Sequence, residues 1–348
     1  MSAELITELV KRYSPSEQES DAVRYLVDWM TKNGFEASVD TVGNAVGWRG
    51  APDAPYTLML LGHIDTVRGE IPVRVEDGIL YGRGSVDAKG PLCAFAAAAA
   101  QAVIPEGWRV IVAGAVEEEV TSSKGARHIA KTYTPDLCII GEPSSADRIT
   151  LGYKGRLIVE YTYTRTVSHT AHPEPSAGAM GVEFWKSVQD WAAHENENHE
   201  RYFDQIMPTL QSINTSSDGF NEAVTMMVGF RLPPRQGPEE VVAAVSRFAA
   251  PNSELRAYGA EKAFQSDKNT PLVRNMLAAI RAQGERPGFV YKTGTSDMNI
   301  VGAVWGCPII AYGPGDSRLD HTPNEHLSLA EYEQAVAVLR HFIEHLSY

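Results

Sequence analysis

Four short apolar stretches of the chain each lead through a turn to an acidic residue or a histidine. They are residues 56–61, 110–116, 137–140 and 309–312, and each is four to seven residues long. Such continuous apolar runs are typical of parallel strands that are buried on both faces. In open α/β sheets, ligands bind beyond the carboxyl ends of these strands. We therefore expect the polar residues that follow the four stretches to converge at one edge of a sheet.

The hydrophobic pattern changes in the middle of the chain. Helical and buried-strand patterns alternate over residues 1–152 and return over residues 266–348. Between them the sequence predicts strand 156–164, helix 177–193, strands 209–216 and 223–232, helix 234–248 and strand 253–260. This β-α-β-β-α-β order is typical of a ferredoxin-like unit. The sequence therefore predicts an α/β catalytic domain in two parts, 1–152 and 266–348, interrupted by an inserted domain at 153–265.

Composition narrows the classes of partner. The chain of 348 residues carries 31 Lys and Arg against 44 Asp and Glu, a formal net charge of −13, which disfavours nucleic acid and anionic membranes. The longest apolar stretch, 92–104, is shorter than the roughly 20 residues of a membrane-crossing helix, and residues 1–13 lack the pattern of a secretory signal. We expect a cytoplasmic protein with no nucleic-acid or membrane partner, whose three scattered cysteines are reduced thiols.

The acids and histidines that follow the strands suit a pair of metal ions. His63 and Asp65 lie two apart, so one side chain can bind a metal while the other orients the imidazole. Adjacent glutamates at 117–119 repel one another unless protons or cations neutralise them. Neighbouring residues at a strand end point to opposite sides, so one carboxylate can bind a metal while the next acts as a base. With the further candidates Asp87, Glu142 and His321, the donor set fits a dinuclear zinc centre.

Two alternatives use the same residues. A single His-x-Asp motif can be no more than a hydrogen-bonded turn. The glycine-dense loop 82–90, which contains Asp87, could instead cradle a phosphate. That loop lacks both the glycine spacing of a dinucleotide-binding motif and the Gly-Lys-Ser/Thr of a P-loop, which favours the metal interpretation.

These motifs, in this order and interrupted by the predicted insert, resemble the zinc aminoacylase and carboxypeptidase family over the whole chain. The family includes acetylornithine deacetylase, succinyl-diaminopimelate desuccinylase and carboxypeptidase G. The resemblance implies a zinc-peptidase-like α/β/α catalytic domain with a ferredoxin-like α+β dimerisation domain, and two Zn²⁺ (or Co²⁺) ions per subunit. The implied ligands are His63 and Glu142 for one ion, Glu119 and His321 for the other, and Asp87 as the bridge.

The resemblance also implies roles for residues that are not ligands. Asp65 orients His63, Glu118 is the general base, and the peptide bond after Asp87 is cis. Glu117 stands where relatives often have aspartate, and we assign it no catalytic role.

In the insert, His169 matches a histidine that stabilises the oxyanion in the active site of the partner of a homodimer; His172 could compete for that role. Arg231, Thr295 and Ser296 lie in segments that resemble the binding site for the substrate carboxylate in relatives. A guanidinium suits a carboxylate, although Arg231 could equally form an internal salt bridge.

Longer stretches are similar to one subfamily. Residues 121–126, 150–156, 292–299 and 312–317 resemble hydrolases of lysine and arginine biosynthesis. These enzymes release lysine or ornithine from the terminal glutamate of a small acidic amino-group carrier protein of the LysW type. The alternatives are a deacetylase of N-acetyl-ornithine or N-acetyl-lysine, a dipeptidase, and a metal-binding scaffold protein that no longer turns over.

An acidic carrier would have to dock on a chain that is itself negatively charged. Only a local cluster of basic residues can offset this repulsion. The alternative is that the basic residues are scattered, solvated charges. The candidates for the cluster are Lys124, Lys154, Arg156, Arg165, Arg231, Arg235, Lys292 and Arg318.

Overall fold

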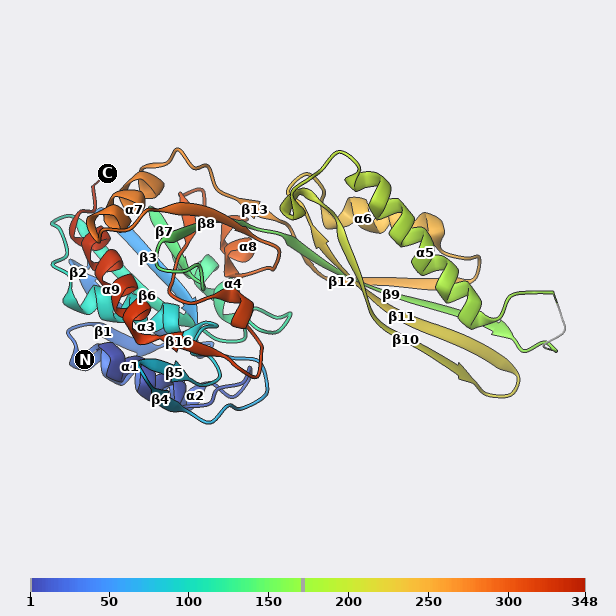
Figure 1. Ribbon diagram of the computed structural model, residues 1–348, viewed down its shortest axis with the longest axis horizontal. Coiled ribbons are helices and arrows are strands. Elements are labelled where there is room, and N and C mark those ends of the chain that lie inside the picture. The colour runs from blue at the N-terminus through green and yellow to red at the C-terminus, as the bar shows by residue number, and fades with distance from the viewer. Residues whose placement is uncertain (1, 170–172, 348) are drawn as a thin grey trace. The chain divides into compact units, whose positions relative to one another are not determined.

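The computed structural model describes residues 2–169 and 173–347, which form two compact units (Figure 1). The larger unit comprises Met1–Gly152, Ser266–Tyr291 and Ser296–Tyr348, and the smaller comprises Tyr153–Gln265 and Lys292–Thr295. The stretch Lys292–Thr295 differs from the predicted boundary. It joins the smaller unit because the amide of Lys154 donates to the carbonyl of Lys292 at 3.3 Å, and Arg231 donates to Thr295 at 2.9 Å.

A mixed sheet forms the centre of the larger unit, with strand order β1-β2-β6-β3-β7-β15-β8-β13 and β14 also paired with β8; the last strand of this order, β13, spans Phe264–Gln265. The strands are β1 (Glu36–Val39), β2 (Ala45–Gly50), β3 (Tyr56–His63), β6 (Trp108–Ala115), β7 (Leu137–Gly141), β8 (Arg148–Tyr153), β14 (Gly288–Lys292) and β15 (Ile309–Ala311). The neighbours β6, β3, β7 and β15 are parallel, and β3 and β7 are buried along almost their whole length. The prediction of four buried parallel strands is confirmed.

The helices of the larger unit form two groups, within each of which the helices pack against one another. One group contains α1, α2, α3, α7 and α9, and in the other α4 packs against α8. Their bounds are α1 (Ser2–Val10), α2 (Ser20–Lys32), α3 (Lys89–Gln101), α4 (Lys124–Thr132), α7 (Pro271–Ala282), α8 (Asp297–Gly302) and α9 (Leu329–Glu344), with a 3₁₀ turn η3 (Ser317–Leu319) before α9. The α/β/α class of the prediction is confirmed.

Helix α3 is buried along nearly its whole length. Its run of five alanines favours a helix and leaves short side chains, so the helix can lie close to β3, α1 and α9. In the described part of the chain, no helix is both long and apolar enough to cross a membrane.

A second, small sheet lies beside the main one, in the order β16-β5-β4. It consists of β4 (Arg74–Glu76), β5 (Ile79–Tyr81) and β16 (His326–Ser328). The antiparallel pairing of β16 with β5 brings together two segments whose paired residues, such as His326 and Tyr81, are far apart in the sequence. Both segments continue directly into loops that carry predicted metal ligands.

The smaller unit is a four-stranded antiparallel sheet with two helices, in the strand order β10-β11-β9-β12. Its elements are β9 (Gly155–Thr166), α5 (Ala177–Asn196), η1 (Tyr202–Asp204), β10 (Met207–Ser217), β11 (Asn221–Leu232), α6 (Pro238–Val245), η2 (Ser246–Phe248) and β12 (Ser253–Glu261). This connectivity and order confirm the ferredoxin-like prediction. Alternate residues of β9, including Leu157, Val159 and Tyr161, lie in a core of the unit's own.

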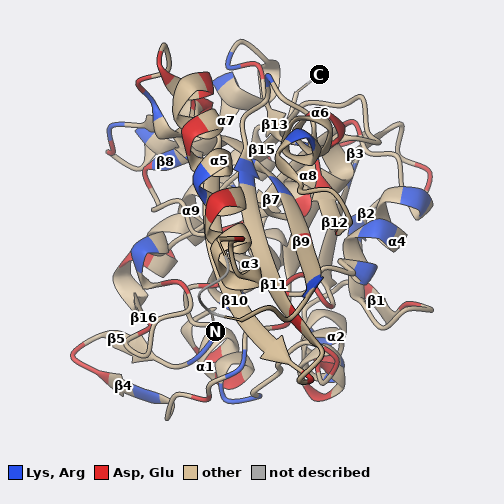
Figure 2. Cartoon of the chain, turned by 90° about the vertical axis from the view of Figure 1, so that its right-hand side faces the viewer, with Lys and Arg blue, Asp and Glu red and all other residues tan. Residues whose placement is uncertain are grey.

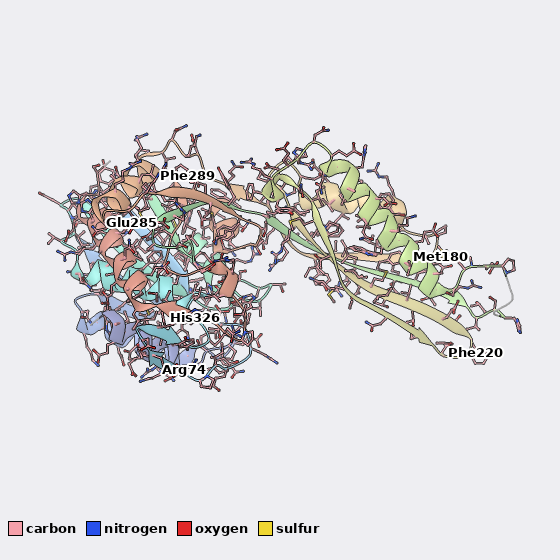
Figure 3. All side chains as sticks on the ribbon, viewed as in Figure 1. Arg74, Met180, Phe220, Glu285, Phe289 and His326 are labelled. Atoms are coloured by element: carbon pink, nitrogen blue, oxygen red, sulfur yellow. The ribbon has the colours of Figure 1, made fainter. Side chains whose placement is uncertain are left out.

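The smaller unit differs from the sequence prediction at the start of its second helix, and it carries an exposed aromatic side chain at a hairpin tip. The helix predicted from residue 234 begins only at Pro238, because Pro233 and Pro234 occupy a turn and Pro238 takes the first helical position, where its missing amide is harmless. Phe220, at the tip of the β10–β11 hairpin, is 79% exposed (Figure 3).

Candidate metal centre

Neighbouring parallel strands position the predicted ligands at one edge of the main sheet. His63 is the last residue of β3, Glu142 directly follows β7, and Glu118 and Glu119 follow β6. Because β3 pairs with both β6 and β7 (Figure 1), the carboxyl ends of the three strands lie side by side. The side chains that follow them therefore lie close together, as the sequence pattern predicts.

Two loops complete the group. Asp87 lies two residues before the start of α3, and His321 follows η3 with a left-handed backbone, φ 61°. The ligand atoms of His63, Asp87 and Glu142 lie within 4.8 Å of one another, and so do those of Asp87, Glu119 and His321. Asp87 belongs to both triads, so its two oxygens can serve two ions.

Individual distances support this division. His63 Nε2 lies 3.2 Å from Asp87 Oδ1. His321 Nε2 lies 3.1 Å from Asp87 Oδ2 and 3.1 Å from Glu119 Oε2. The structure thus brings all five predicted ligands together, with a different oxygen of Asp87 facing each histidine. The peptide bond Asp87–Ala88 is cis, as the resemblance implies.

The pKa shifts of the clustered side chains indicate a site that favours bound cations. Burial raises the pKa of Glu118 and Glu142 well above the ordinary value, and it also raises the pKa of Glu119. Burial opposes ionisation of Asp87 as well, but hydrogen bonds from His321 and His63 outweigh it and lower the pKa of this carboxyl. Hydrogen bonds to Asp87 and Glu119 raise the pKa of His321 to about 10.

The donor set fits two divalent ions. It offers imidazole nitrogens and carboxylate oxygens, the mixture that zinc and its neighbours among the transition metals prefer, whereas calcium takes oxygen alone. Bound cations would neutralise the buried carboxylates, which otherwise repel one another. The residues present therefore fit a dinuclear centre.

Asp65 makes more contacts than the sequence predicts. Its Oδ1 lies 3.4 Å from His63 Nδ1, in line with an orienting role. The same carboxylate also accepts the backbone amides of Glu118 and Glu119, each at 3.0 Å, and the hydroxyl of Ser16 at 2.7 Å. Asp65 therefore fixes the loop that carries the candidate base as well as the imidazole. No sequence pattern points to Ser16, which lies 49 residues away from Asp65.

Glu117 is held in other contacts. Its carboxylate accepts a hydrogen bond from Ser122 Oγ at 2.7 Å and forms an ion pair with Lys124. The bond to Lys124 is the main reason that the pKa of Glu117 is lowered, opposite to the shift of its neighbours. This side chain belongs to neither ligand triad.

The other predicted site residues lie outside the triads. In the smaller unit, Arg231 Nη1 donates to Thr295 Oγ1 at 2.9 Å, so these two candidates for substrate binding lie together, and His169 is exposed. In the larger unit, Ser296 caps α8: its Oγ accepts the amide of Met298 at 3.2 Å. That bond accounts for Ser296 structurally, and the substrate roles of these residues stay predictions. The competing His172 lies outside the described residues.

The proposed basic patch needs correction. Lys154 is wrong as a surface residue, because it is fully buried and its ammonium donates to the carbonyls of Tyr202 and Gln205; burial lowers its pKa to about 8. Other candidates are paired with acids of their own unit: Lys124 with Glu117, Arg165 with Glu174 and Glu222, Arg235 with Glu195, and Arg318 with Asp316. On α5, basic and acidic residues are interspersed (Figure 2). These pairings favour scattered charges.

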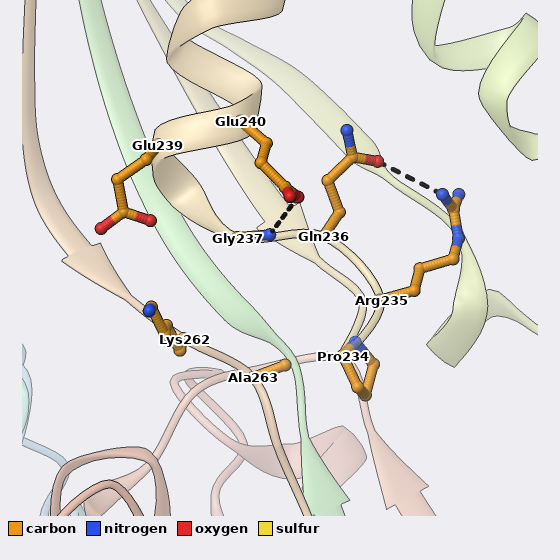
Figure 4. Close-up of a pocket in the computed structure, with 8 residues that line it drawn as sticks. All are labelled: Pro234, Arg235, Gln236, Gly237, Glu239, Glu240, Lys262 and Ala263. Carbon is orange, nitrogen blue, oxygen red and sulfur yellow. Dashed lines mark hydrogen bonds between the residues drawn. The ribbon is translucent and has the colours of Figure 1, made fainter.

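Arg235 also lines a hollow of about 330 Å³ on the smaller unit (Figure 4). There its Nη1 donates to Gln236 Oε1 at 3.2 Å, and Glu240 accepts the amide of Gly237 at 3.0 Å. The lining contains no residue of either ligand triad or of the predicted substrate site.

Comparisons with known proteins agree with the fold and the site. The chain is 46% identical over 344 residues to the LysW-lysine hydrolase of Deinococcus radiodurans, covering 97% of this chain and 94% of that protein. It is 38% identical to a Thermococcus kodakarensis protein provisionally named a LysW-lysine/LysW-ornithine hydrolase, covering 99% and 91% of the two chains. The M20 family metallo-carboxypeptidase Sso-CP2 of Sulfolobus solfataricus has the same fold, with a TM-score of 0.77, 19% identity, and 99% and 98% of the two chains covered.

A family model gives the same answer independently of any single relative. The model of peptidase family M20/M25/M40 matches residues 59–345. The matched region includes all five residues of the two ligand triads. The chain belongs to peptidase family M20/M25/M40.

Proposed function

We propose that this chain is a dinuclear metal-dependent amidohydrolase that releases lysine, ornithine or both from the C-terminal glutamate of an acidic LysW-type carrier protein. The observation that supports this choice of substrate is the 46% identity, across nearly the whole chain, to a LysW-lysine hydrolase. The chemistry is supported by the two ligand triads that share Asp87. A cytoplasmic location remains part of the proposal.

We assign the metals to the five clustered residues. His63 and Glu142 would hold one ion, Glu119 and His321 would hold the other, and Asp87, which belongs to both triads, would serve both ions. Zinc is the metal proposed, with cobalt as the alternative. Two such ions, once bound, would polarise the amide carbonyl and lower the pKa of water.

Glu118 is the proposed proton carrier of the reaction. Its carboxylate takes a proton from water as the water oxygen forms a bond to the amide carbonyl carbon. When the carbon–nitrogen bond breaks, the same proton goes to the departing α-amine, so one residue serves as base and then as acid. Asp65 supports this role because it holds the backbone amide of Glu118 at 3.0 Å.

The proposal includes a homodimer in which His169 stabilises the oxyanion in the partner's site. What supports it is the match of residues 168–173 to the family segment and the exposure of His169. Chains with His169→Ala and chains with Glu118→Gln are each expected to have little activity. After the two are unfolded together and refolded, about half of the chains should pair as mixed dimers, and each mixed dimer regains one intact site. Refolding either variant alone is the control, and equal activity in the mixture and the controls would rule out sharing between chains.

The substrate is tested by comparing four candidate compounds under the same conditions. The purified zinc-loaded enzyme is given carrier-linked lysine, carrier-linked ornithine, N-acetyl-lysine and N-acetyl-ornithine, and kcat/KM is measured for each by released amino acid. We expect the carrier conjugates to exceed the acetyl compounds by at least about 100-fold, a difference of roughly 2.7 kcal/mol in transition-state binding. A preference for acetyl-ornithine would instead identify a deacetylase.

A further inference from the structure

A buried ion pair contacts the backbone of the loop that carries Asp87, and neither of its residues belongs to the ligand triads. Arg83 Nη1 lies 2.7 Å from Glu325 Oε2, and the two side chains are 6% and 0% exposed. The residues are 242 positions apart in the sequence. A buried charge of this kind is strongly unfavourable unless it is paired and hydrogen-bonded, so the contact has to be made whenever this unit is folded.

The second oxygen of Glu325 holds the loop of the bridging ligand. Glu325 Oε1 accepts the backbone amide of Val86 at 2.9 Å and that of Asp87 at 3.1 Å. The carbonyl of Glu325 accepts the amide of Gly82 at 3.3 Å. Glu325 therefore holds the loop that carries Asp87 at both ends, because it accepts hydrogen bonds from three backbone amides of that loop.

Glu325 also belongs to the segment that carries His321, a member of the second triad. His321 lies four residues before it, and β16 begins directly after it. The segment is anchored there, because His326 pairs with Tyr81 of β5, with ring centroids 5.2 Å apart; Figure 3 marks His326 at this place. Arg83 is fixed in turn, since its Nε donates to the carbonyl of Gly69 at 3.0 Å.

We propose that Glu325, held by Arg83, is a positioning residue of the metal centre that fixes Asp87 relative to His321. The inference rests on the proposed metal centre and adds to it two residues that touch no metal. The pairing of β5 with β16 links the loop that carries Asp87 to the loop that carries His321. Because ligand atoms must be held within a few tenths of an ångström for tight binding, a shift of the Asp87 loop should weaken the triad of Asp87, Glu119 and His321 first.

Glu325→Gln tests this with a readout other than activity. The variant keeps the shape of the side chain and one acceptor oxygen, but it loses the charge that Arg83 pairs with. Zinc affinity is measured by competition with a chromogenic chelator, and the metal-induced rise in Tm is measured in parallel. We expect two zinc ions per wild-type chain, and in the variant a roughly 10–100-fold weaker affinity for one of them.

Asp136→Asn is the matched control. Asp136 Oδ2 accepts the amide of Thr57 at 2.7 Å, so it is also a carboxylate that holds a backbone amide, but it lies by the first residues of β3, at the opposite end from His63. This variant should lower the Tm of the metal-free protein while leaving both zinc affinities unchanged. The contrast separates loss of positioning from general destabilisation.

Arg83→Lys covers the case in which Glu325→Gln does not fold. It keeps the positive charge beside Glu325 but cannot also reach the carbonyl of Gly69, so a smaller loss of zinc affinity is expected. If wild type binds two zinc ions and the variants bind them equally well, the positioning role is overturned and the metal centre stands. If wild type binds no zinc, the proposed centre and this inference fall together.

Discussion

Glu118→Gln should lower kcat by roughly 10²–10⁴-fold while leaving two metal ions bound. The amide can neither take the proton from water nor return it to the departing amine. It has nearly the same shape as the carboxylate, and Glu118 is not a member of either ligand triad, so metal content is expected to be unchanged. Turnover of the carrier-linked substrate and metal content by atomic absorption are measured on the same preparation.

Glu117→Gln is the control for this prediction. Glu117 is the neighbouring glutamate, but it pairs with Lys124 and Ser122, so its loss should affect stability more than rate. Near-normal turnover by a metal-loaded Glu118→Gln enzyme would mean that another group is the base. A large loss in Glu117→Gln at full metal content would make Glu117 the first residue to examine.

Asp87→Ala should remove metal and activity together. Asp87 is the one residue common to both triads, and its two oxygens face His63 and His321 at 3.2 and 3.1 Å. Without it the ions have no bridging ligand, and the remaining carboxylates are left with less compensation for their burial. We expect zinc content after gel filtration to fall from two ions to less than one per chain, and kcat/KM to fall by several orders of magnitude.

Asp53→Ala gives the comparison for an ordinary acidic residue. Asp53 is exposed on the connection before β3 and lies away from the strand end that carries His63. Its replacement should change neither zinc content nor rate. If Asp87→Ala retained two tightly bound ions, Asp87 would not be the bridge, and the division of the ligands into two triads would be wrong.

Local patterns were sufficient for the fold. Runs such as Leu58–Leu61 and Leu137–Ile140 are apolar on both faces, and β9 alternates along its length. These periods distinguish a strand buried on both faces from one that faces a core on one side only. The order of elements then determined the ferredoxin-like unit. The start of α6 was missed by four residues because the predicted helix began within the Pro233–Pro234 turn.

The sequence by itself also determined which residues are the candidates for the chemistry. Histidine and carboxylate side chains bind zinc, and a side chain that follows a parallel strand lies at the carboxyl edge of the sheet. His63, Glu119 and Glu142 satisfy both conditions. Both pieces of information are local, so they can be read without knowing which loops meet.

Only the tertiary structure decided what holds these residues in place. Ser16 reaches Asp65 across 49 residues, and Arg83 reaches Glu325 across 242. Lys154, expected on the surface, is buried because the carbonyls of Tyr202 and Gln205 receive its ammonium. A charged residue in a loop has the same local sequence whether it is solvated or buried in a pair. Its environment is set by partners that folding brings from distant parts of the chain, and no local pattern encodes them.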